Sequence, residues 1–173
     1  MALAYRSGET TPSALVDVLL DRIEAARADN IFITVTAERA RAEAKAATER
    51  YRAGRPLSAL DGVPVAWKDL IDIKGAPTTA GSRHFGSGPV KTADQASAAN
   101  AAAAGMVTMG KLNMTEMAYS GLGLNPHYGT ALNPHNRKVP HSPGGSSSGS
   151  GAAVAARLVP CAIGTDTGGS VRI

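Results

Sequence analysis

Residues 60–73 read Leu-Asp-Gly-Val-Pro-Val-Ala-Trp-Lys-Asp-Leu-Ile-Asp-Ile, and the hydrophobic period of the chain changes within this segment. Asp61 and Gly62 are typical of a turn, and the apolar run after them predicts a short strand. A lysine, Lys68, stands where this strand should end. Helical patterns occur both before and after the segment, so the sequence predicts a strand between helices.

Two helices and another strand are predicted before this segment. Thr10 or Thr11 can cap a helix over residues 12–28, which has a proline in its first turn and apolar residues at helical spacing. The β-branched run at residues 31–36 predicts a strand. The run at residues 37–53 is rich in alanine and charged residues and predicts a more exposed helix.

Helix and strand patterns continue to alternate along the rest of the chain. They predict a helix over residues 93–105, a buried strand over 106–109, a loop rich in glycine, proline and serine over 120–151, a helix over 152–158, a strand over 159–163 and a glycine-rich loop over 164–170. This alternation predicts an α/β fold with a mixed, partly parallel β-sheet flanked by helices.

The composition of the 173 residues restricts the class of protein. Hydrophobic residues make up 43% and charged residues 18%. No apolar run approaches the roughly 18 residues that a membrane span requires, so no membrane association is expected. The net charge of +4 comes from cations scattered among acids, and aromatic residues make up only 4%, so a nucleic-acid partner is not expected either.

The amino end and the single cysteine bear on the cellular compartment. Charged and polar residues interrupt the first apolar run, so no signal peptide is visible and a cytoplasmic location is expected. Cys161 has no partner for an internal disulfide, and we expect it to be a small buried hydrophobic residue.

Two loops rich in glycine and serine, at residues 143–150 and 165–170, are the first candidates for chemistry. Glycine lets successive backbone N–H groups point into one concavity, which can hold a phosphate or a developing oxyanion with a serine at its rim. The phosphate interpretation is weaker, because neither loop ends in Gly-Lys-Ser or Gly-Lys-Thr. A pair of solvated turns is the alternative that the loops alone leave open.

A serine nucleophile needs a base, and histidine and lysine are the candidates. The four histidines lie in loops without local partners and are expected at the surface; they are His84, His127, His135 and His141. Five of the six lysines have polar or mixed surroundings and are expected to be solvated. Lys68 differs, because the apolar residues around it would remove water from its amine and lower its pKa toward neutrality. A lysine that extends from the strand end into water is the alternative.

Five motifs in this order resemble those of the amidase signature family, the Ser-cisSer-Lys amide hydrolases. They read Asp-Gly-Val-Pro-Val-Ala-Trp-Lys at 61–68, Thr-Thr-Ala-Gly-Ser at 78–82, Gly-Lys-Leu-Asn at 110–113, Pro-Gly-Gly-Ser-Ser at 143–147 and Gly-Thr-Asp-Thr-Gly-Gly-Ser-Val-Arg at 164–172. The resemblance implies that Ser170 is the acylated nucleophile and that Lys68 is the base. Ser146 matches the bridging serine, which follows a cis peptide bond in the family.

The resemblance also implies roles around these three residues. Backbone N–H groups of the nucleophile loop would form the oxyanion hole, at Thr167, Gly168, Gly169 and Ser170. Ser147 and Asp166 match positions that support this loop through hydrogen bonds. Met117 and Ser120 lie in a segment beside the acyl pocket, where substrate contacts are expected. No metal and no organic cofactor is implied.

The sequence departs from the family pattern in two ways. Ser148 stands where the family commonly has glycine, which requires a negative φ at this position. The chain is also less than half as long as family members usually are. Residues 1–173 are therefore interpreted as the amino-terminal portion of a single amidase domain, with exposed sheet edges and apolar patches.

Three functions are compatible with these motifs. The first is an amidase that hydrolyses the C–N bond of a small-molecule carboxylic amide through an acyl-enzyme intermediate, for which a homodimer is a compatible assembly. The second is the A subunit of a tRNA-dependent amidotransferase for glutamyl-tRNA(Gln) or aspartyl-tRNA(Asn), which shares the motifs and releases ammonia from glutamine for a partner protein. The third is a non-catalytic fragment that binds an anion. Residues 114–128 favour the first.

Overall fold

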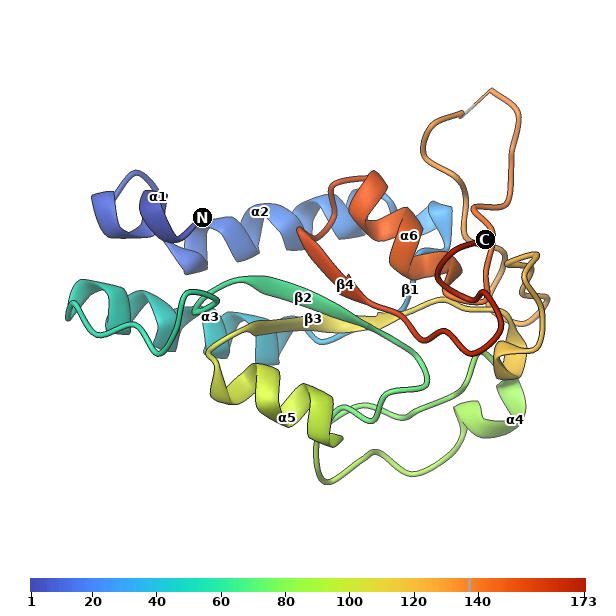
Figure 1. Ribbon diagram of the computed structural model, residues 1–173, viewed down its shortest axis with the longest axis horizontal. Helices are drawn as coiled ribbons and strands as arrows, with labels where there is room; N and C mark the ends of the chain where they lie inside the picture. Colours follow the sequence, from blue (N-terminus) through green and yellow to red (C-terminus); the bar gives the residue numbers. More distant parts are fainter. Residues whose placement is uncertain (137) are drawn as a thin grey trace.

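A mixed four-stranded sheet forms the centre of the protein in the computed structural model, which describes residues 1–136 and 138–173. Its strands are β1 (Phe32–Val35), β2 (Pro64–Lys68), β3 (Val107–Leu112) and β4 (Cys161–Ile163), in the spatial order β1-β3-β2-β4 (Figure 1). β2 pairs in parallel with both β3 and β4, and β1 pairs antiparallel with β3. The predicted α/β fold with a mixed, partly parallel sheet is confirmed.

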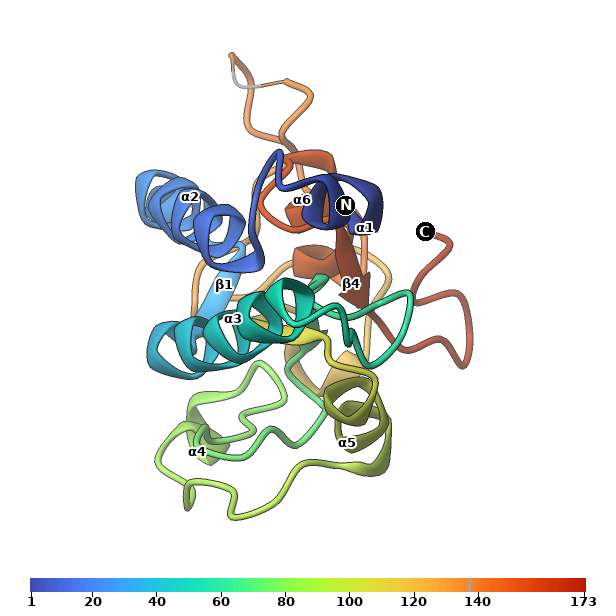
Figure 2. The same ribbon diagram turned by 90° about the vertical axis from the view of Figure 1, so that its left-hand side faces the viewer.

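Helices cover both faces of this sheet (Figure 2). The longer ones are α2 (Pro12–Ala25), α3 (Ala37–Arg52), α5 (Ala96–Ala103) and α6 (Ser148–Ala155), and the shorter ones are α1 (Ala2–Ser7), α4 (Arg83–Gly86) and the 3-10 helices η1 (Arg27–Asp29) and η2 (Glu116–Ala118). α2, α3 and α6 share one hydrophobic core with β2 and β3, whereas α5 packs on a second core. Within the described residues, no helix is both long enough and apolar enough to cross a membrane.

The alternation of side chains along β2 decides which groups reach each face of the sheet. Val65 and Trp67 belong to the core that α5 covers, and Ala66 belongs to the core that α2 and α6 cover. Lys68 stands two positions after Ala66, so its side chain is on the face that α6 covers. All residues of β2 are buried, as is usual for a strand with parallel neighbours on both sides.

α6 begins at Ser148, inside the predicted loop of residues 120–151, rather than at residue 152 as the sequence predicts. A Cβ on Gly149 would lie 2.5 Å from the Asn113 nitrogen and 2.6 Å from the Ile31 carbonyl oxygen, so the first turn of α6 packs closely against the strand ends. This long-range contact overrides a composition that favours a loop. Ser148 is helical with a negative φ, as a serine in place of the family's usual glycine requires.

The other predicted helices and strands differ from the structure mainly at their ends. Thr11 caps α2 as predicted, because its Oγ1 accepts a hydrogen bond from the Ala14 N–H at 3.1 Å. α2 ends at Ala25 rather than near residue 28, α5 is shorter than the predicted 93–105, and β3 extends to Leu112. α1 has no counterpart among the predicted helices.

The outer strands β1 and β4 leave two sheet edges without a neighbouring strand in the described part of the chain. Cys161 on β4 is half-buried at the margin of the second core, rather than fully buried as predicted, and burial raises the pKa of its thiol. Exposed apolar side chains gather after β3 and at the last residues; they are Met117, Tyr119, Leu122, Leu124, Val171 and Ile173.

A buried carboxylate holds the predicted turn at Asp61 and Gly62, directly before β2. Arg50 on α3 donates two hydrogen bonds to the Asp61 carboxylate, at 2.8 and 2.6 Å, and the Leu57 N–H donates a third at 2.8 Å. The Asp61 side chain is fully buried, and any Cβ on Gly105 would overlap it. This ion pair therefore fixes where β2 enters the sheet.

Replacing this carboxylate should destabilise the fold. We expect Asp61→Ala to lower the free energy of unfolding by about 3 kcal/mol, because Arg50 and a backbone donor lose their buried partner. Asp17→Ala is the matched control, since its ion pair with Arg41 is exposed and should contribute less than about 1 kcal/mol. Urea unfolding of the full-length protein, followed by circular dichroism, measures both. Equal losses in the two variants would contradict the role given to Asp61.

Candidate active site

Lys68, the last residue of β2, has a fully buried side chain. Its Nζ donates a hydrogen bond to Ser146 Oγ at 2.7 Å and another to Thr165 Oγ1 at 2.8 Å, with a longer contact of 3.5 Å to the Thr165 carbonyl. Ser146 precedes α6 and Thr165 follows β4, so the strand order and the packing of α6 bring three distant segments together. The alternative in which Lys68 extends into water is wrong.

Burial lowers the pKa of Lys68 from 10.5 to about 8, because the charged form of the amine loses its hydration. The carboxylate of Asp166 opposes this effect, since a negative charge favours the ammonium form. The close partners of the amine are hydroxyl groups, which can both donate and accept hydrogen bonds. An amine with a pKa near 8 is partly neutral at pH 7 and can accept a proton.

Ser146 is fully buried and lies directly before the first residues of α6. The Gly145–Ser146 peptide bond is cis, as the resemblance implies. The Ser146 carbonyl accepts a hydrogen bond from the Thr115 N–H at 3.0 Å, which joins this loop to the segment after β3.

The loop after β4 lies beside the start of α6 and carries Ser170 (Figure 1). The Ser147 N–H donates to the Ser170 carbonyl at 3.1 Å, and the Ser147 hydroxyl is 3.3 Å from both the carbonyl oxygen and the amide nitrogen of Thr165. Within the described residues, the Ser170 hydroxyl has no hydrogen-bond partner. The structure thus joins Lys68 directly to Ser146, and it joins Ser170 to them through the backbone of Ser147.

Asp166 organises the turn that ends at the nucleophile candidate. Its carboxylate accepts hydrogen bonds from the Gly169 N–H at 2.9 Å, from the Val171 N–H at 3.2 Å, and from the Arg172 guanidinium at 2.9 and 3.0 Å. The guanidinium is the main reason that the pKa of Asp166 lies well below its usual range, and the Gly169 amide adds to it. The supporting role that the resemblance implies for Asp166 stays a prediction.

The amides predicted for the oxyanion hole differ in their availability. The Gly169 N–H donates to Asp166 and is therefore occupied in this structure. The amides of Thr167, Gly168 and Ser170 donate no hydrogen bond to any described residue, so they are available to an anionic oxygen. Their role in binding a substrate oxygen stays a prediction.

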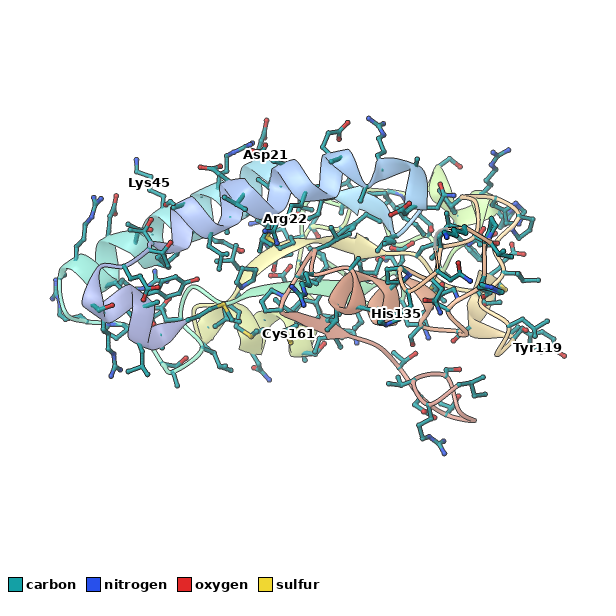
Figure 3. All side chains as sticks on the ribbon, turned by 90° about the horizontal axis from the view of Figure 1, so that it is seen from above. Asp21, Arg22, Lys45, Tyr119, His135 and Cys161 are labelled. Atoms are coloured by element: carbon teal, nitrogen blue, oxygen red, sulfur yellow. The ribbon has the colours of Figure 1, made fainter. Side chains whose placement is uncertain are left out.

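The two predicted substrate-binding residues lie on the segment after β3. Met117 is exposed, and the Ser120 hydroxyl accepts a hydrogen bond from the Leu122 N–H at 3.1 Å. Neither forms a hydrogen bond with Lys68 in the part of the chain that the structure describes. Figure 3 shows that the neighbouring Tyr119 projects from the end of the molecule, and its side chain is 94% exposed. Contacts of this segment with a substrate stay a prediction.

The histidines are separate from the lysine and the two serines. His84, His135 and His141 are exposed as predicted, while His127 is half-buried with its Nε2 3.0 Å from the Glu116 carboxylate. No group of three or more histidine, cysteine, aspartate or glutamate side chains is arranged to hold a metal ion among the described residues.

The prediction that Lys111 is solvated is wrong. This lysine is fully buried on β3, with its Nζ 2.5 Å from Asp69 Oδ1, 3.3 Å from the Pro77 carbonyl and 3.1 Å from Thr78 Oγ1. The equally buried carboxylate of Asp69 compensates the charge, which makes burial possible. The signal in the sequence is the same one that singles out Lys68, a lysine at the end of an apolar run.

Thr165 is a contact of the buried amine that the sequence analysis does not identify. Its motif, Thr-Asp-Thr-Gly-Gly-Ser, is interpreted from the sequence only as an anion-binding loop that ends in a serine. The contact arises because β4 and β2 are parallel neighbours, so the first residues after β4 reach the end of β2. No local pattern in the sequence encodes that pairing.

The comparison with known sequences agrees with this geometry. A sequence model of the family described as Amidase matches residues 14–173. The chain belongs to the amidase family. The A subunit of glutamyl-tRNA(Gln) amidotransferase from Cupriavidus necator is 47% identical over 171 residues, and its counterpart from Chloroflexus aggregans is 45% identical over 171 residues. These matches cover 99% and 98% of this chain but 33% and 34% of the relatives, so the chain spans about a third of their length.

Several solved structures, amidases among them, share the fold. A chain of the vestigial protein complex that reveals the evolutionary origins of an s-triazine catabolic enzyme is 43% identical, with a TM-score of 0.91 over 96% of this chain and 36% of that one. The native peptide amidase from Stenotrophomonas maltophilia is 33% identical, with a TM-score of 0.88 over 97% and 35%. A bacterial aryl acylamidase of the amidase signature family is 29% identical, with a TM-score of 0.89 over 99% and 36%. Membership of the amidase signature family is thereby confirmed.

The buried amine of Lys68 should titrate well below the ordinary lysine value of 10.5. In the full-length protein labelled with 13C at lysine Cε, we expect one resonance to change with a midpoint near pH 8, because burial disfavours the ammonium form of Lys68. Lys68→Met should remove that resonance, and Lys45→Met, at an exposed position on α3, should leave it in place. A midpoint near the ordinary value of 10.5 for the resonance lost in Lys68→Met would contradict the assignment.

Proposed function

We propose that the protein cleaves the C–N bond of a carboxylic amide by acyl-enzyme catalysis, with Ser170 as nucleophile, Ser146 as relay and Lys68 as base. The observation that carries the proposal is the contact of 2.7 Å between Lys68 Nζ and Ser146 Oγ in a site where the lysine is fully buried. A solvated lysine would be protonated at neutral pH and unable to act as base. Membership of the amidase family supports the same reaction.

The first half of the proposed reaction moves one proton and forms one bond. Ser170 Oγ attacks the carbonyl carbon of the amide while its proton passes to Ser146 Oγ, and the proton of Ser146 passes to Lys68 Nζ. The negative charge develops on the carbonyl oxygen, where the free amides of Thr167, Gly168 and Ser170 would stabilise it. The products of this step are a tetrahedral intermediate and a lysine ammonium.

The second half returns the proton and releases the amine. The Lys68 ammonium donates its proton through Ser146 to the leaving nitrogen, the C–N bond breaks, and the acyl group stays on Ser170. Water, deprotonated along the same path, then attacks the acyl-enzyme and frees the carboxylic acid. The Ser170 hydroxyl must turn toward Ser146 during the reaction, and the bond from the Ser147 N–H to the Ser170 carbonyl supports this by keeping the two loops together.

The relatives favour a second candidate for the substrate. The A subunit of glutamyl-tRNA(Gln) amidotransferase is 45–48% identical over most of this chain in several bacteria, including Pseudomonas entomophila and Anaeromyxobacter dehalogenans. Hydrolysis of glutamine with transfer of the ammonia to a partner protein would use the same serine and lysine chemistry. This candidate differs from a free-standing amidase in its substrate and in its need for a partner.

Substitution of the three side chains tests the proposed reaction. We expect Ser170→Ala, Ser146→Ala and Lys68→Met each to lower kcat for amide hydrolysis by at least about a thousandfold, because each removes one link of the proton path. Ser150→Ala is the control: Ser150 lies on α6 and its hydroxyl donates to the Ile163 carbonyl at 3.1 Å, away from Lys68. It should retain kcat within about threefold. A folded wild type that hydrolyses neither glutamine nor any amide of a broad panel would favour the non-catalytic anion-binding alternative.

A substrate panel separates the two candidates. An amidase should hydrolyse simple aliphatic or aryl amides without a partner, with kcat/KM at least about tenfold above that for glutamine. A component of an amidotransferase should prefer glutamine and should co-purify with a second protein from its own cells. Ammonia release from glutamine and aniline release from acetanilide by the full-length protein, alone and with any co-purified partner, decide between these outcomes.

A further inference from the structure

Three loop segments are joined to one another next to the backbone of Asp69 and Ser146, and none of their contacts belongs to the proton path. They are residues 79–81, residues 114–117 and residues 125–128. We call the first two the wall of the site, because one contacts the residue after Lys68 and the other contacts Ser146. The geometry of this wall bears on which amides the proposed reaction accepts.

The first segment of the wall is fixed to the residue that follows the base. Asp69 accepts hydrogen bonds at its backbone carbonyl from the Ala80 N–H and at its carboxylate from the Thr79 N–H, both at 3.0 Å. The Thr79 hydroxyl donates to the same carboxylate, whose other oxygen pairs with Lys111. Both Asp69 and Lys111 are fully buried, so this attachment is shielded from water.

The second segment of the wall is fixed to the relay serine. The Thr115 N–H donates to the Ser146 carbonyl at 3.0 Å. A Cβ on Gly145 would lie 2.9 Å from Thr115 Oγ1, so the two stretches of chain are in close contact. Residues 114–117 therefore border the backbone beside Ser146.

Asn125 joins the two segments of the wall. Its side-chain nitrogen donates one hydrogen bond to the Gly81 carbonyl at 2.9 Å and another to the Met114 carbonyl at 2.8 Å. Its side-chain oxygen accepts from the N–H groups of His127 and Tyr128, at 2.8 and 3.0 Å. The residue is buried, and these four bonds use the full capacity of a carboxamide.

The wall tolerates little change around this carboxamide. Gly81 has a φ of +69°, and a Cβ there would lie 2.9 Å from both the Asn125 side-chain nitrogen and the Met114 carbonyl oxygen. The Met117 N–H donates to the Ala80 carbonyl at 2.8 Å, and both of these residues have a positive φ without being glycine. Such conformations persist only where the surrounding contacts enforce them, and they are common at binding sites.

We propose that Asn125 is a positioning residue that sets the spacing between residues 79–81 and residues 114–117, and thereby determines which substituents of the amide fit beside Lys68 and Ser146. The inference rests on the proposed amide hydrolysis. Asn125 contacts neither the reacting serine nor the base, so its effect is on substrate selection rather than on the proton path.

The test uses an isosteric change in the full-length protein. Asn125→Asp keeps the acceptor for the turn at residues 127 and 128, but it replaces the donating group with an oxygen that faces two carbonyl oxygens. We expect the wall to loosen, so that the ratio of kcat/KM between p-nitroanilides of two acyl chain lengths falls toward one by about tenfold. The pH midpoint of kcat should stay near 8, because Lys68 keeps its partners.

Asn113→Asp is the matched control. Asn113 is also a buried asparagine, and its side-chain nitrogen donates to the carbonyls of Asn30 and Gly129, both at 2.7 Å, which lie outside the wall. Its side-chain oxygen accepts from the Met114 N–H at 2.7 Å, an acceptor that aspartate keeps. This variant should lower the melting temperature and leave the selectivity ratio within about twofold of the wild type. A stability effect common to both asparagines is in this way separated from an effect on substrate selection.

Gly81→Ala places a Cβ against the Asn125 side-chain nitrogen and the Met114 carbonyl oxygen. It should shift the ratio of kcat/KM between the two p-nitroanilides in the same direction as Asn125→Asp. Unchanged ratios in a folded Asn125→Asp or Gly81→Ala protein would overturn the inference. It would also be overturned if both variants failed to fold while Asn113→Asp folded, because the network would then serve folding alone. An inactive wild type would contradict the proposed function itself, whereas an active wild type with unshifted variants contradicts only the role of Asn125.

Discussion

The site depends on an amine that is buried without a carboxylate of its own. An ion removed from water is unfavourable unless it is paired or neutralised, and Lys68 meets this constraint through a lowered pKa. Lys111, on the adjacent strand, meets it through an ion pair with Asp69. The two lysines are equally buried, but within the described residues a carboxylate contacts the amine of Lys111 and only hydroxyl and carbonyl oxygens contact that of Lys68. The difference lies in the groups that contact each amine, which are the hydroxyls of Ser146 and Thr165 for Lys68 and the Asp69 carboxylate for Lys111.

The fold maintains this environment through the order of its strands and the position of one helix. β2 lies between β3 and β4 in the sheet. The side chain of Lys68, the last residue of β2, is therefore enclosed by the segments that follow these two strands. The alternation along β2 turns Lys68 toward α6, and Gly149 lets α6 approach closely enough for the preceding serine to reach the amine. The Thr115 N–H, in the segment that follows β3, donates a hydrogen bond to the Ser146 carbonyl. Each of these contacts joins residues that are remote in the chain.

The sequence predicts the local parts of this arrangement better than the distant ones. The class of fold, the strand that ends at Lys68 and the Thr11 cap follow from periodicity and capping, which are properties of neighbouring residues. The burial of Lys68 is suggested by the apolar run around it, but an apolar run alone fails to distinguish it from Lys111, because the compensating Asp69 is distant from Lys111 in sequence.

The early start of α6 is missed for a related reason, since the contact of Gly149 with the strand ends outweighs its unfavourable helix propensity. The pairing of Ser146 with Lys68 follows from the family motifs, whereas the contact of Thr165 with the amine and the hydrogen bonds of Asn125 become visible only in the folded chain.

The hydroxyl surroundings of Lys68 have a consequence for the direction of proton flow. A neutral amine has two N–H groups and one lone pair, which match a bond to Thr165 Oγ1 and acceptance of the Ser146 proton. The ammonium has three N–H groups but only two close oxygens, because the Thr165 carbonyl is 3.5 Å away. The cation is therefore less well solvated than the neutral amine, which agrees with the lowered pKa of Lys68. In the proposed reaction the same pocket would let Lys68 both take up and return a hydrogen, because a pKa near 8 keeps its neutral and charged forms close in free energy at neutral pH.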